Sequence, residues 1–462
     1  MVFSSPIFLF AFLPGILLLY FICHKHHELK NWVLTLGSLF FYAFGEPLCV
    51  FLMMVSILVN YGFGLLIEKH EGRKRLLLVL AVVWNLGALF IFKYLNFAVD
   101  TVNLVFGSRI EISRIALPIG ISFYTFQIMS YVIDVYRGKC GAQKNLMHLG
   151  LYVSLFPQLI AGPIVRYVDI EQSIRKRETN LDRLYQGFLR FGMGFAKKIL
   201  IADQLAPLVN TVFSEAYPSW ILHWVGAIAY TLQIYYDFSG YSDMAIGLGK
   251  IFGFDFAENF DYPYISRSIK EFWRRWHISL SSWFRDYLYI PLGGNRKGKG
   301  RTYLNLLIVF LATGLWHGAS FNFLVWGLYH GVFLILERIW LGKALEKCPK
   351  VLQHLYTILV VVLGWVFFRA DDLGKAAAYI GRMFTPGEGA LAQLNYVMDG
   401  QYWFCLAAGI LFSLPMLRRL LVNDHPKPLA AKIYPVAVIL LFALAICYMV
   451  GSGYSPFLYF RF

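Results

Sequence analysis

The stretch LCVFLMMVSILVNYGFGLLI (48–67) is followed by the charged loop EKHEGRKR (68–75) and by a second apolar run at 76–99. An apolar run of about 20 residues is long enough for a helix to span the roughly 30 Å of hydrocarbon in a bilayer. A short basic loop between two such runs is typical of the cytoplasmic side of a membrane protein. This pattern therefore predicts two membrane-spanning helices joined on that side.

The same alternation of apolar runs and basic loops continues along the whole chain. Of its 462 residues, 58% are hydrophobic and only 15% are charged, which excludes an ordinary soluble protein. We therefore expect one all-α polytopic membrane domain over residues 1–462, with about eleven or twelve crossings and both termini outside. Crossings are predicted near residues 6–23, 31–45, 48–67, 76–99, 115–136, 184–213, 220–250, 302–316, 319–336, 353–368, 401–417 and 433–450.

Two segments interrupt this pattern. LGLYVSLFPQLIAGP (149–163) is short, contains two prolines and has basic flanks, as a re-entrant segment would. Residues 267–301 form a long amphipathic basic segment, in which only Glu271 and Asp286 are acidic. The formal net charge of +15 is concentrated in such segments between apolar runs, so it indicates membrane topology rather than binding of nucleic acid.

Three histidines lie where they could carry chemistry. His317 lies between Trp316 and Gly318 in ATGLWHGAS (312–320), where glycines let the chain bend between two apolar stretches, so residues 302–336 form a candidate hairpin. His277 lies inside the apolar arc of residues 268–294 if these form one helix, and it is either tolerated at an interface or lines a reactive pocket. His330 would not face the same site as His317 unless the chain breaks at Gly314–Gly318.

The other histidines and the acidic residues of the apolar runs have simpler explanations. Histidines at 24, 26, 27, 70 and 425 lie in basic loops, and those at 148, 223 and 354 lie at the edges of predicted crossings. Asp134, Asp237 and Asp243 could couple transport to a cation or could hold helices together, and we favour the structural role. Six scattered cysteines without a CxxC pair predict neither a disulfide framework nor a thiolate metal site.

Six motifs occur together in a recognisable order. They are LPIGISFYTFQ (117–127), FPQLIAGPIVR (156–166), YYDFSGYSDMAIGLGKIFGF (235–254), FWRRWHISLSSWFRDYLYIPLGGNRKG (272–298), GLWHGASFNFLVWGLYHG (314–331) and PFLYFRF (456–462). Together they resemble the membrane-bound O-acyltransferase family, in the bacterial branch typified by alginate O-acetyltransferase and teichoic acid D-alanyl transferase. The resemblance implies a ring of tilted helices around a central tunnel, through which a cytoplasmic thioester donor reaches an acceptor that arrives from outside.

The resemblance also implies roles for individual residues. His317 matches the catalytic histidine of the family, which we expect to act as general base, and His277 matches a second histidine, which we expect to position the thioester or polarise its carbonyl. Trp316 and Trp283 are candidates for substrate binding, and Trp316 or the amide beside Gly318 could stabilise an oxyanion. No metal and no tightly bound cofactor are expected.

The expected co-substrate is acetyl-CoA or an acyl carrier protein that presents its phosphopantetheine arm. Arg296, Lys297 and Lys299 could attract this anionic donor, although topology and lipid headgroups explain the same charges. The acceptor would be a cell-surface polysaccharide or an extracytoplasmic partner protein in a relay, and the location would be the bacterial cytoplasmic membrane. The alternatives are a transporter of polysaccharide or lipid precursors, or a lipid acyltransferase of the same family.

Overall fold

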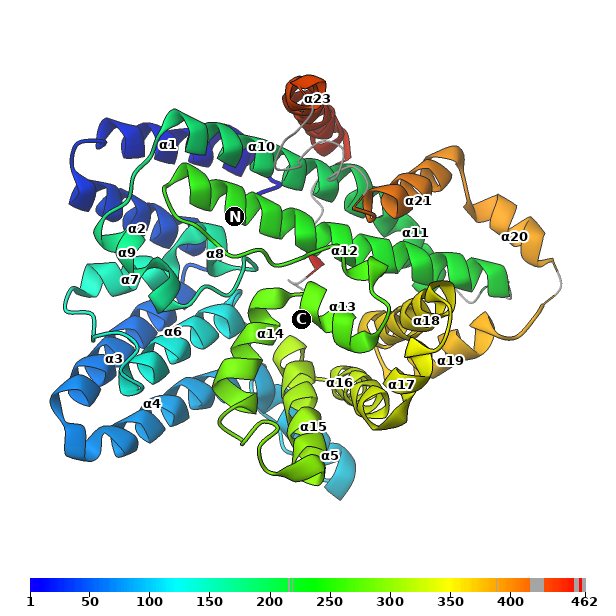
Figure 1. Ribbon diagram of the computed structural model, residues 1–462, viewed down its shortest axis with the longest axis horizontal. Helices are drawn as coiled ribbons and strands as arrows, with labels where there is room; N and C mark the ends of the chain where they lie inside the picture. Colours follow the sequence, from blue (N-terminus) through cyan, green and yellow to red (C-terminus); the bar gives the residue numbers. More distant parts are fainter. Residues whose placement is uncertain (215–216, 218, 388, 416–427, 453–456, 459–462) are drawn as a thin grey trace. The chain divides into compact units, whose positions relative to one another are not determined.

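The computed structural model describes residues 1–214, 217, 219–387, 389–415, 428–452 and 457–458. In these residues the regular secondary structure consists of helices alone (Figure 1). The prediction of an all-α fold is therefore confirmed for the part of the chain that is described.

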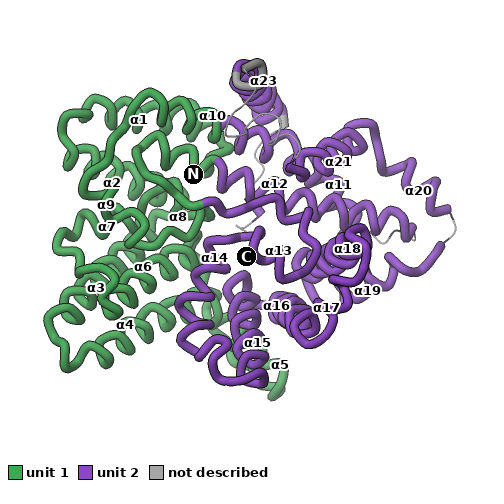
Figure 2. The backbone as a smooth tube through the Cα atoms, viewed as in Figure 1, with its two compact units in different colours: residues 1–191, 244–257 green, residues 192–243, 258–462 purple. Residues whose placement is uncertain are grey.

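The chain folds into two compact units (Figure 2). Unit 1 comprises Met1–Phe191 and Met244–Ala257, and unit 2 comprises Gly192–Asp243 and Glu258–Phe462. The helices of unit 1 are α1 (Leu13–Ile22), α2 (His27–Ala43), α3 (Cys49–Lys69), α4 (Lys74–Leu89), α5 (Leu95–Phe106), α6 (Ile121–Tyr136), α7 (Leu146–Ser154), α8 (Phe156–Leu159) and α9 (Tyr167–Arg175).

Unit 2 holds the helices that follow in the chain. They are α11 (Asp203–Ser214), α13 (Ile269–Arg275), α14 (Ile278–Phe284), α15 (Gly298–His317), α16 (Phe321–Leu336), α17 (Gly342–Glu346), α18 (Lys350–Arg369), α19 (Leu373–Met383), α20 (Ala390–Val397), α21 (Gly400–Phe412) and α23 (Pro428–Ser452). Helices α10 (Leu181–Lys197) and α12 (Trp220–Ile251) contribute residues to both units. Short π or 3-10 segments occupy Phe8–Phe12, Glu71–Arg73, Phe90–Tyr94, Lys198–Ala202, Pro263–Ile265, Arg285–Tyr289 and Glu337–Leu341.

Five described helices are long and apolar enough to cross a membrane. They cover Cys49–Lys69, Glu71–Phe106, Phe321–Glu346, Lys350–Arg369 and Lys432–Gly451, and two shorter apolar helices cover Phe8–Ile22 and Gly400–Phe412. The two runs with which the sequence analysis began correspond to the first two of these helices. The remaining predicted crossings coincide with helices that are shorter or more polar, and their passage through a membrane stays a prediction.

The α15–α16 pair occupies the predicted hairpin region of unit 2, and glycines hold its two helices close together. A Cβ atom at Gly314 would overlap the backbone of Phe323, and a Cβ atom at Gly327 would overlap the backbone of Phe310. Small residues at such crossings let helix backbones approach closely. The hairpin therefore depends on glycine at both positions.

The three acidic residues of the apolar runs each have a basic partner. Asp134 lies 3.4 Å from the ammonium of Lys139 in unit 1. In unit 2, Asp237 lies 2.8 Å from Lys198, and Asp243 lies 2.6 Å from Lys197. These ion pairs support the structural role that we favoured for these residues.

The segment at 149–163 contains most of α7 and all of α8, and these helices are buried within unit 1 from His148 onward. Leu155 separates them in a non-helical conformation, and its preceding neighbour Ser154 donates a hydrogen bond of 2.8 Å to the carbonyl of Gly150. The segment is therefore too interrupted to be one long helix, and its re-entrant path stays a prediction.

Candidate active site

His317 lies at the end of α15, where the helix stops at a bend. The following residue, Gly318, has an extended conformation, and the next helix begins at Phe321. The imidazole is 4% exposed, and its ring centroid lies 5.0 Å from Trp316, 5.0 Å from Trp326 and 5.2 Å from Phe368. The bend between α15 and α16 thus leaves the imidazole at a helix end, surrounded by aromatic rings.

The expectation of one continuous helix over residues 268–294 is wrong at His277. The chain leaves α13 after Arg275, and His277 takes a left-handed conformation, with φ of 45°, before α14 begins. Such a conformation is uncommon for a residue with a side chain and is held by its surroundings. The turn directs His277 into the interior, where it is 1% exposed.

Asn259 supplies the contacts that hold this turn. Its backbone carbonyl accepts a hydrogen bond of 3.0 Å from the amide of Ile278, and its side-chain Oδ1 accepts one of 3.2 Å from the amide of Ser279. The same Oδ1 lies 3.1 Å from Nδ1 of His277. The sequence analysis did not identify Asn259, because the residue lies 18 positions upstream of the histidine that it orients.

This contact fixes which nitrogen of His277 carries the proton. Because a backbone amide can only donate, the atom of Asn259 that faces Ser279 is the oxygen, so Nδ1 of His277 donates to that oxygen. Burial lowers the pKa of His277 to about 3, so the ring is neutral at physiological pH. The other nitrogen, Nε2, is then an acceptor, and it has no hydrogen-bond partner within the described residues.

The indole ring of Trp316 lies close to both imidazole rings. Its ring centroid is 5.9 Å from His277 and 5.0 Å from His317. His277 also packs edge-on against Phe238 of α12, with a distance of 4.7 Å between the ring centroids. The structure therefore brings His277, His317 and Trp316 together in unit 2, as the prediction of one shared site requires.

The bend at Gly318, between α15 and α16, also brings His330 near His317. Trp326 contacts both rings, at 5.0 Å from His317 and 5.3 Å from His330. Trp283, by contrast, packs against Phe284 and Tyr287, and neither contact involves a histidine. The structure thus places Trp316 beside both predicted histidines, and a substrate-binding role for either tryptophan stays a prediction.

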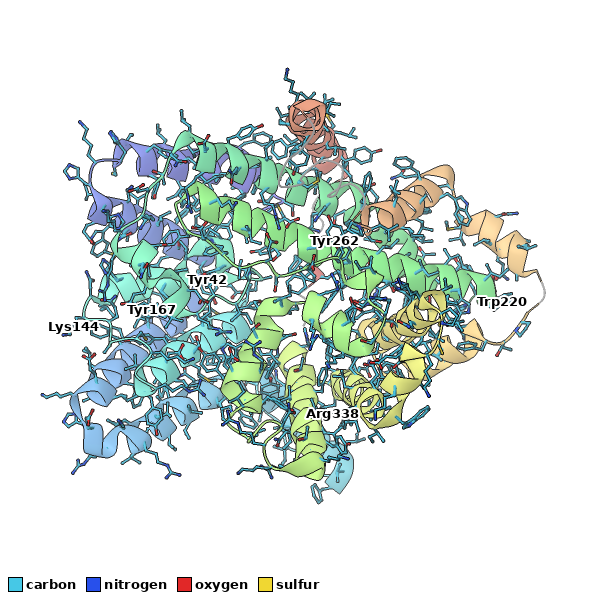
Figure 3. The ribbon with its side chains drawn as sticks, viewed as in Figure 1. Tyr42, Lys144, Tyr167, Trp220, Tyr262 and Arg338 are labelled. Atoms are coloured by element: carbon cyan, nitrogen blue, oxygen red, sulfur yellow. The ribbon has the colours of Figure 1, made fainter. Side chains whose placement is uncertain are left out.

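The three basic residues of the predicted donor dock are exposed and lie just before or within the first turn of α15. His317 is the last residue of this helix of 20 residues, which is about 30 Å long at 1.5 Å per residue. Arg338, labelled in Figure 3, adds a further exposed cation, and it donates a hydrogen bond of 3.0 Å to Asn295. Helix α15 therefore carries a basic surface at one end and an imidazole at the other.

Comparisons with known proteins identify the family of this chain. The model of the MBOAT, membrane-bound O-acyltransferase family, matches residues 143–371, which include His277 and His317. A probable alginate O-acetylase of Pseudomonas putida is 43% identical over 490 residues, which cover all of both chains. The chain belongs to the membrane-bound O-acyltransferase family.

More distant relatives are named for other activities. A peptidoglycan O-acetyltransferase of Helicobacter pylori is 37% identical over 86% of this chain and 82% of its own. A teichoic acid D-alanyltransferase of Bacillus subtilis is 31% identical over 54% of this chain and 66% of its own. The acyltransferase family is thus shared while the acceptors named for its members differ.

Two other histidines at the edges of predicted crossings have partners in the protein. His148 and His223 are buried, His148 lies 3.0 Å from Glu28, and Nδ1 of His223 lies 2.7 Å from the carbonyl of Ser219. The amide of Gly318 itself donates to the carbonyl of Gly314 in the last turn of α15, and an oxyanion donor beside Gly318 stays a prediction. His425 lies outside the described residues.

The C-terminal motif is described only at Phe457 and Leu458, and both are buried in unit 2. Phe457 packs against Tyr241 at 4.8 Å and against Phe238 at 6.1 Å, and Phe238 in turn contacts His277. The amide of Leu458 donates to Asp237 at 2.9 Å. Asp237 therefore holds Leu458 in unit 2, next to the rings that contact His277.

The described residues contain no group of three or more His, Cys, Asp or Glu side chains that could hold a metal ion. The candidate site instead offers imidazole nitrogens and aromatic surfaces. Such a set of groups can accept and return protons.

Proposed function

We propose that this chain is a membrane O-acetyltransferase that moves an acetyl group from a cytoplasmic thioester to a hydroxyl of a cell-surface polysaccharide, or of a partner protein that passes it on. The observation that carries the proposal is the convergence of His277 and His317 on Trp316. The relatives named for acetylation of alginate and of peptidoglycan support acetyl as the transferred group.

In the proposed reaction His317 acts as general base. It takes the proton of the acceptor hydroxyl while the hydroxyl oxygen attacks the thioester carbonyl carbon. The carbon–sulfur bond then breaks, and the protonated imidazole returns the proton to the departing thiolate. No covalent enzyme intermediate is needed, because the thioester is already an activated acyl donor.

His277 takes a different role in this proposal from the one that its motif suggested. A neutral ring whose Nδ1 donates to Asn259 presents Nε2 as an acceptor, and an acceptor cannot polarise a carbonyl oxygen. Nε2 can accept a hydrogen bond from the incoming hydroxyl. We therefore assign His277 to the orientation of the acceptor rather than to the donor carbonyl.

The donor is acetyl-CoA or an acetylated carrier protein, and it docks at Arg296, Lys297 and Lys299. These side chains are exposed at the start of α15. Complementary charge mainly raises the rate at which an anionic donor is encountered. The proposal places the protein in the bacterial cytoplasmic membrane with both termini outside.

The experiment uses membranes that contain the full chain, supplied with radiolabelled acetyl-CoA or with acetylated carrier protein. Alginate, peptidoglycan fragments and a lipid extract are offered as acceptors in parallel. Transfer to a polysaccharide, or to an extracytoplasmic protein, that disappears in the His317→Ala variant supports the proposal. Transfer to lipid alone, or full transfer by the variant, would overturn it.

A further inference from the structure

Two cationic side chains are buried in unit 1, where α1, α2 and the end of α9 meet residues 252–254. Lys30 is 5% exposed and Arg177 is 7% exposed. Burying a charge is costly unless it is paired, so buried lysines and arginines normally have acidic partners. The contacts of Lys30 and Arg177 show which groups compensate these two positive charges.

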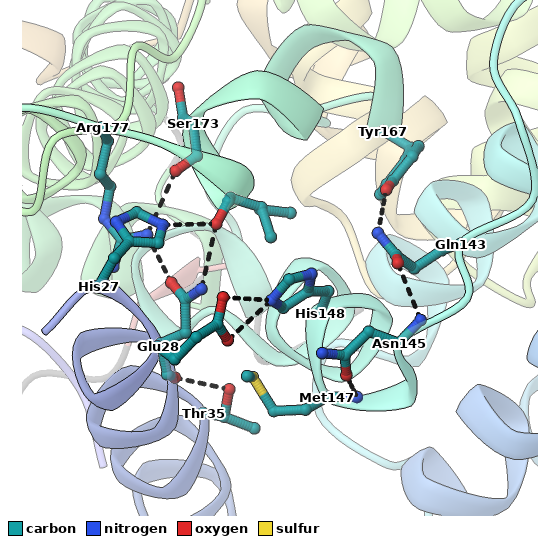
Figure 4. A network of polar contacts seen from close by, with 12 residues as sticks. His27, Glu28, Thr35, Gln143, Asn145, Met147, His148, Tyr167, Ser173 and Arg177 are labelled. Atoms are coloured by element: carbon teal, nitrogen blue, oxygen red, sulfur yellow. Dashed lines mark hydrogen bonds and ion pairs between the residues drawn. The ribbon is translucent and has the colours of Figure 1, made fainter.

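Arg177 is held by neutral oxygen atoms. Its Nε donates to the hydroxyl of Tyr20 and to the carbonyl of Phe252, both at 3.0 Å. Its Nη1 donates to Asn31 at 2.5 Å and to the carbonyl of Ser173 at 3.2 Å, in the network that Figure 4 shows. Its Nη2 is buried and has no hydrogen-bond partner within the described residues.

Lys30 lies beside the same tyrosine. Its ammonium is 5.3 Å from the centroid of the Tyr20 ring, and the guanidinium carbon of Arg177 is 5.6 Å from that centroid. Burial, together with the charge of Arg177, lowers the pKa of Lys30. The two cations therefore share one aromatic ring and destabilise each other.

The nearby carboxylates are directed elsewhere. Glu28 contacts His148 at 3.0 Å, as Figure 4 shows, and Asp255 pairs with Arg183 at 2.9 Å. Among the described residues, no carboxylate lies within 4.0 Å of the side-chain nitrogens of Lys30 or Arg177.

A buried lysine in unit 2 shows the usual solution. Lys198 lies 2.6 Å from Asp203 and 2.8 Å from Asp237, so two carboxylates balance one charge. Lys30 and Arg177 have no carboxylate in contact within the described residues, and the charge of Glu28 acts on Arg177 only from beyond contact distance. The charges of Lys30 and Arg177 therefore leave room for an anion that comes from outside the chain.

We propose that Lys30, Arg177 and Tyr20 form a binding site for a phosphate group, carried by a phospholipid or by the thioester donor. The one guanidinium nitrogen of Arg177 without a partner, Nη2, and the ammonium of Lys30 can both donate to the oxygens of a phosphate. The exposed cation Lys176, next to Arg177 in the chain, adds to the attraction of the site for a phosphate.

The exposed apolar side chains beside the site favour the phospholipid as the source of this phosphate. Leu19, Ile22 and Leu29 are 53%, 67% and 49% exposed, respectively. In a membrane protein such side chains contact acyl chains, so a lipid could place its phosphate at the cations and its tails on these residues.

The test measures thermal unfolding of the full chain, purified in a nonionic detergent and freed of lipid. Dihexanoyl phosphatidylglycerol, coenzyme A and inorganic phosphate are titrated separately, with potassium chloride at matched ionic strength as the reference. Binding to the folded state raises the midpoint of unfolding in a saturable way. A response to phosphatidylglycerol alone identifies a lipid site, and a response to coenzyme A identifies the donor phosphate.

Lys30→Gln is the central variant, and Lys25→Gln is its matched control, because Lys25 is exposed in the loop before α2. The control should respond like the wild type, while Lys30→Gln should need at least tenfold more of the effective probe. Without a probe, Lys30→Gln should be at least as stable as the wild type, since it removes a like charge beside Arg177. This expectation separates lost binding from lost folding.

The proposal is overturned if no phosphate-bearing probe stabilises the wild type beyond chloride, or if Lys30→Gln responds fully. Arg177→Lys tests the guanidinium edge and should also weaken the response, and if this variant fails to fold, the Lys30→Gln result decides alone. Because the measurement is stability rather than acetyl transfer, its failure leaves the proposed enzymatic function untouched.

Discussion

His277 and His330 lie in the same unit, and both are buried among aromatic rings, at 1% and 0% exposed. His277 stands at a broken helix junction, and Asn259 accepts the hydrogen bond of its Nδ1. His330 lies inside α16, and neither of its ring nitrogens has a hydrogen-bond partner within the described residues. A hydrogen bond that fixes a tautomer marks a histidine prepared for proton chemistry, whereas burial alone does not.

His330 instead resembles a packing residue. Its Nε2 lies so close to α18 that a Cβ atom at Gly364 would be 2.8 Å away, and its ring lies 5.1 Å from that of Trp273. His317 shares the helix-end position of His277 and contacts the same Trp316. We therefore propose a chemical role for the two histidines at helix ends and a packing role for the histidine in the helix interior.

The largest effect is expected for His317→Ala. Loss of a general base should reduce acyl transfer by about 10² to 10⁴-fold, while expression and membrane insertion stay near wild type. The measurement is the rate of acetyl transfer per amount of inserted protein. Retention of most of the activity would remove His317 from the proposed mechanism.

The second effect is expected at Asn259, which should orient His277 without contacting substrate. Asn259→Leu should lower the transfer rate by about tenfold to a hundredfold, as is typical when a partner that orients a functional histidine is lost. His277→Ala should be at least as damaging, and it serves as the reference for complete loss of this ring.

Asn259→Asp separates orientation from simple packing. Its carboxylate can still accept the hydrogen bond of Nδ1, so it should restore much of the rate that the leucine variant loses. A negative charge beside the ring raises the pKa of His277, so the acidic limb of the rate–pH profile should move to higher pH. Equal damage by Leu and Asp with unchanged profiles would indicate a structural role only.

The third effect tests the proposed packing role of His330. His330→Ala should open a cavity and lower the stability by roughly 2 kcal/mol, but transfer per folded molecule should stay within a few fold of wild type. Thermal unfolding in detergent and a rate normalised to folded protein measure the two quantities separately. If this variant is as inactive as His317→Ala, the division between helix ends and helix interior is wrong.

The smallest effect on maximal rate is expected from charge reversal of Arg296, Lys297 and Lys299 together. A donor dock at the start of α15 predicts a raised apparent KM for the donor, an unchanged kcat and a weaker dependence of the rate on ionic strength. Reversal of Lys343 and Lys347, which lie in or just after α17, provides a control on another basic stretch. Unchanged donor kinetics in the triple variant would leave the loop as a lipid contact.

The sequence by itself determined the all-α class and the membrane-spanning character of the strongest apolar runs, and through its motifs it predicted His317 as a catalytic residue. The first two properties depend on the length of apolar runs, which is a short-range feature of the chain. The combined motifs also indicated the family, which the comparisons then showed.

Only the tertiary structure decided which residues share a site. The left-handed turn at His277 depends on Asn259, and the buried cation Arg177 bonds to Tyr20, which lies 157 positions away in the chain. Helical periodicity describes one segment at a time, so it cannot foresee a turn imposed by a distant amide, nor two cations brought to one ring. Packing between segments sets both, because a buried polar group takes its partner from whatever element lies beside it.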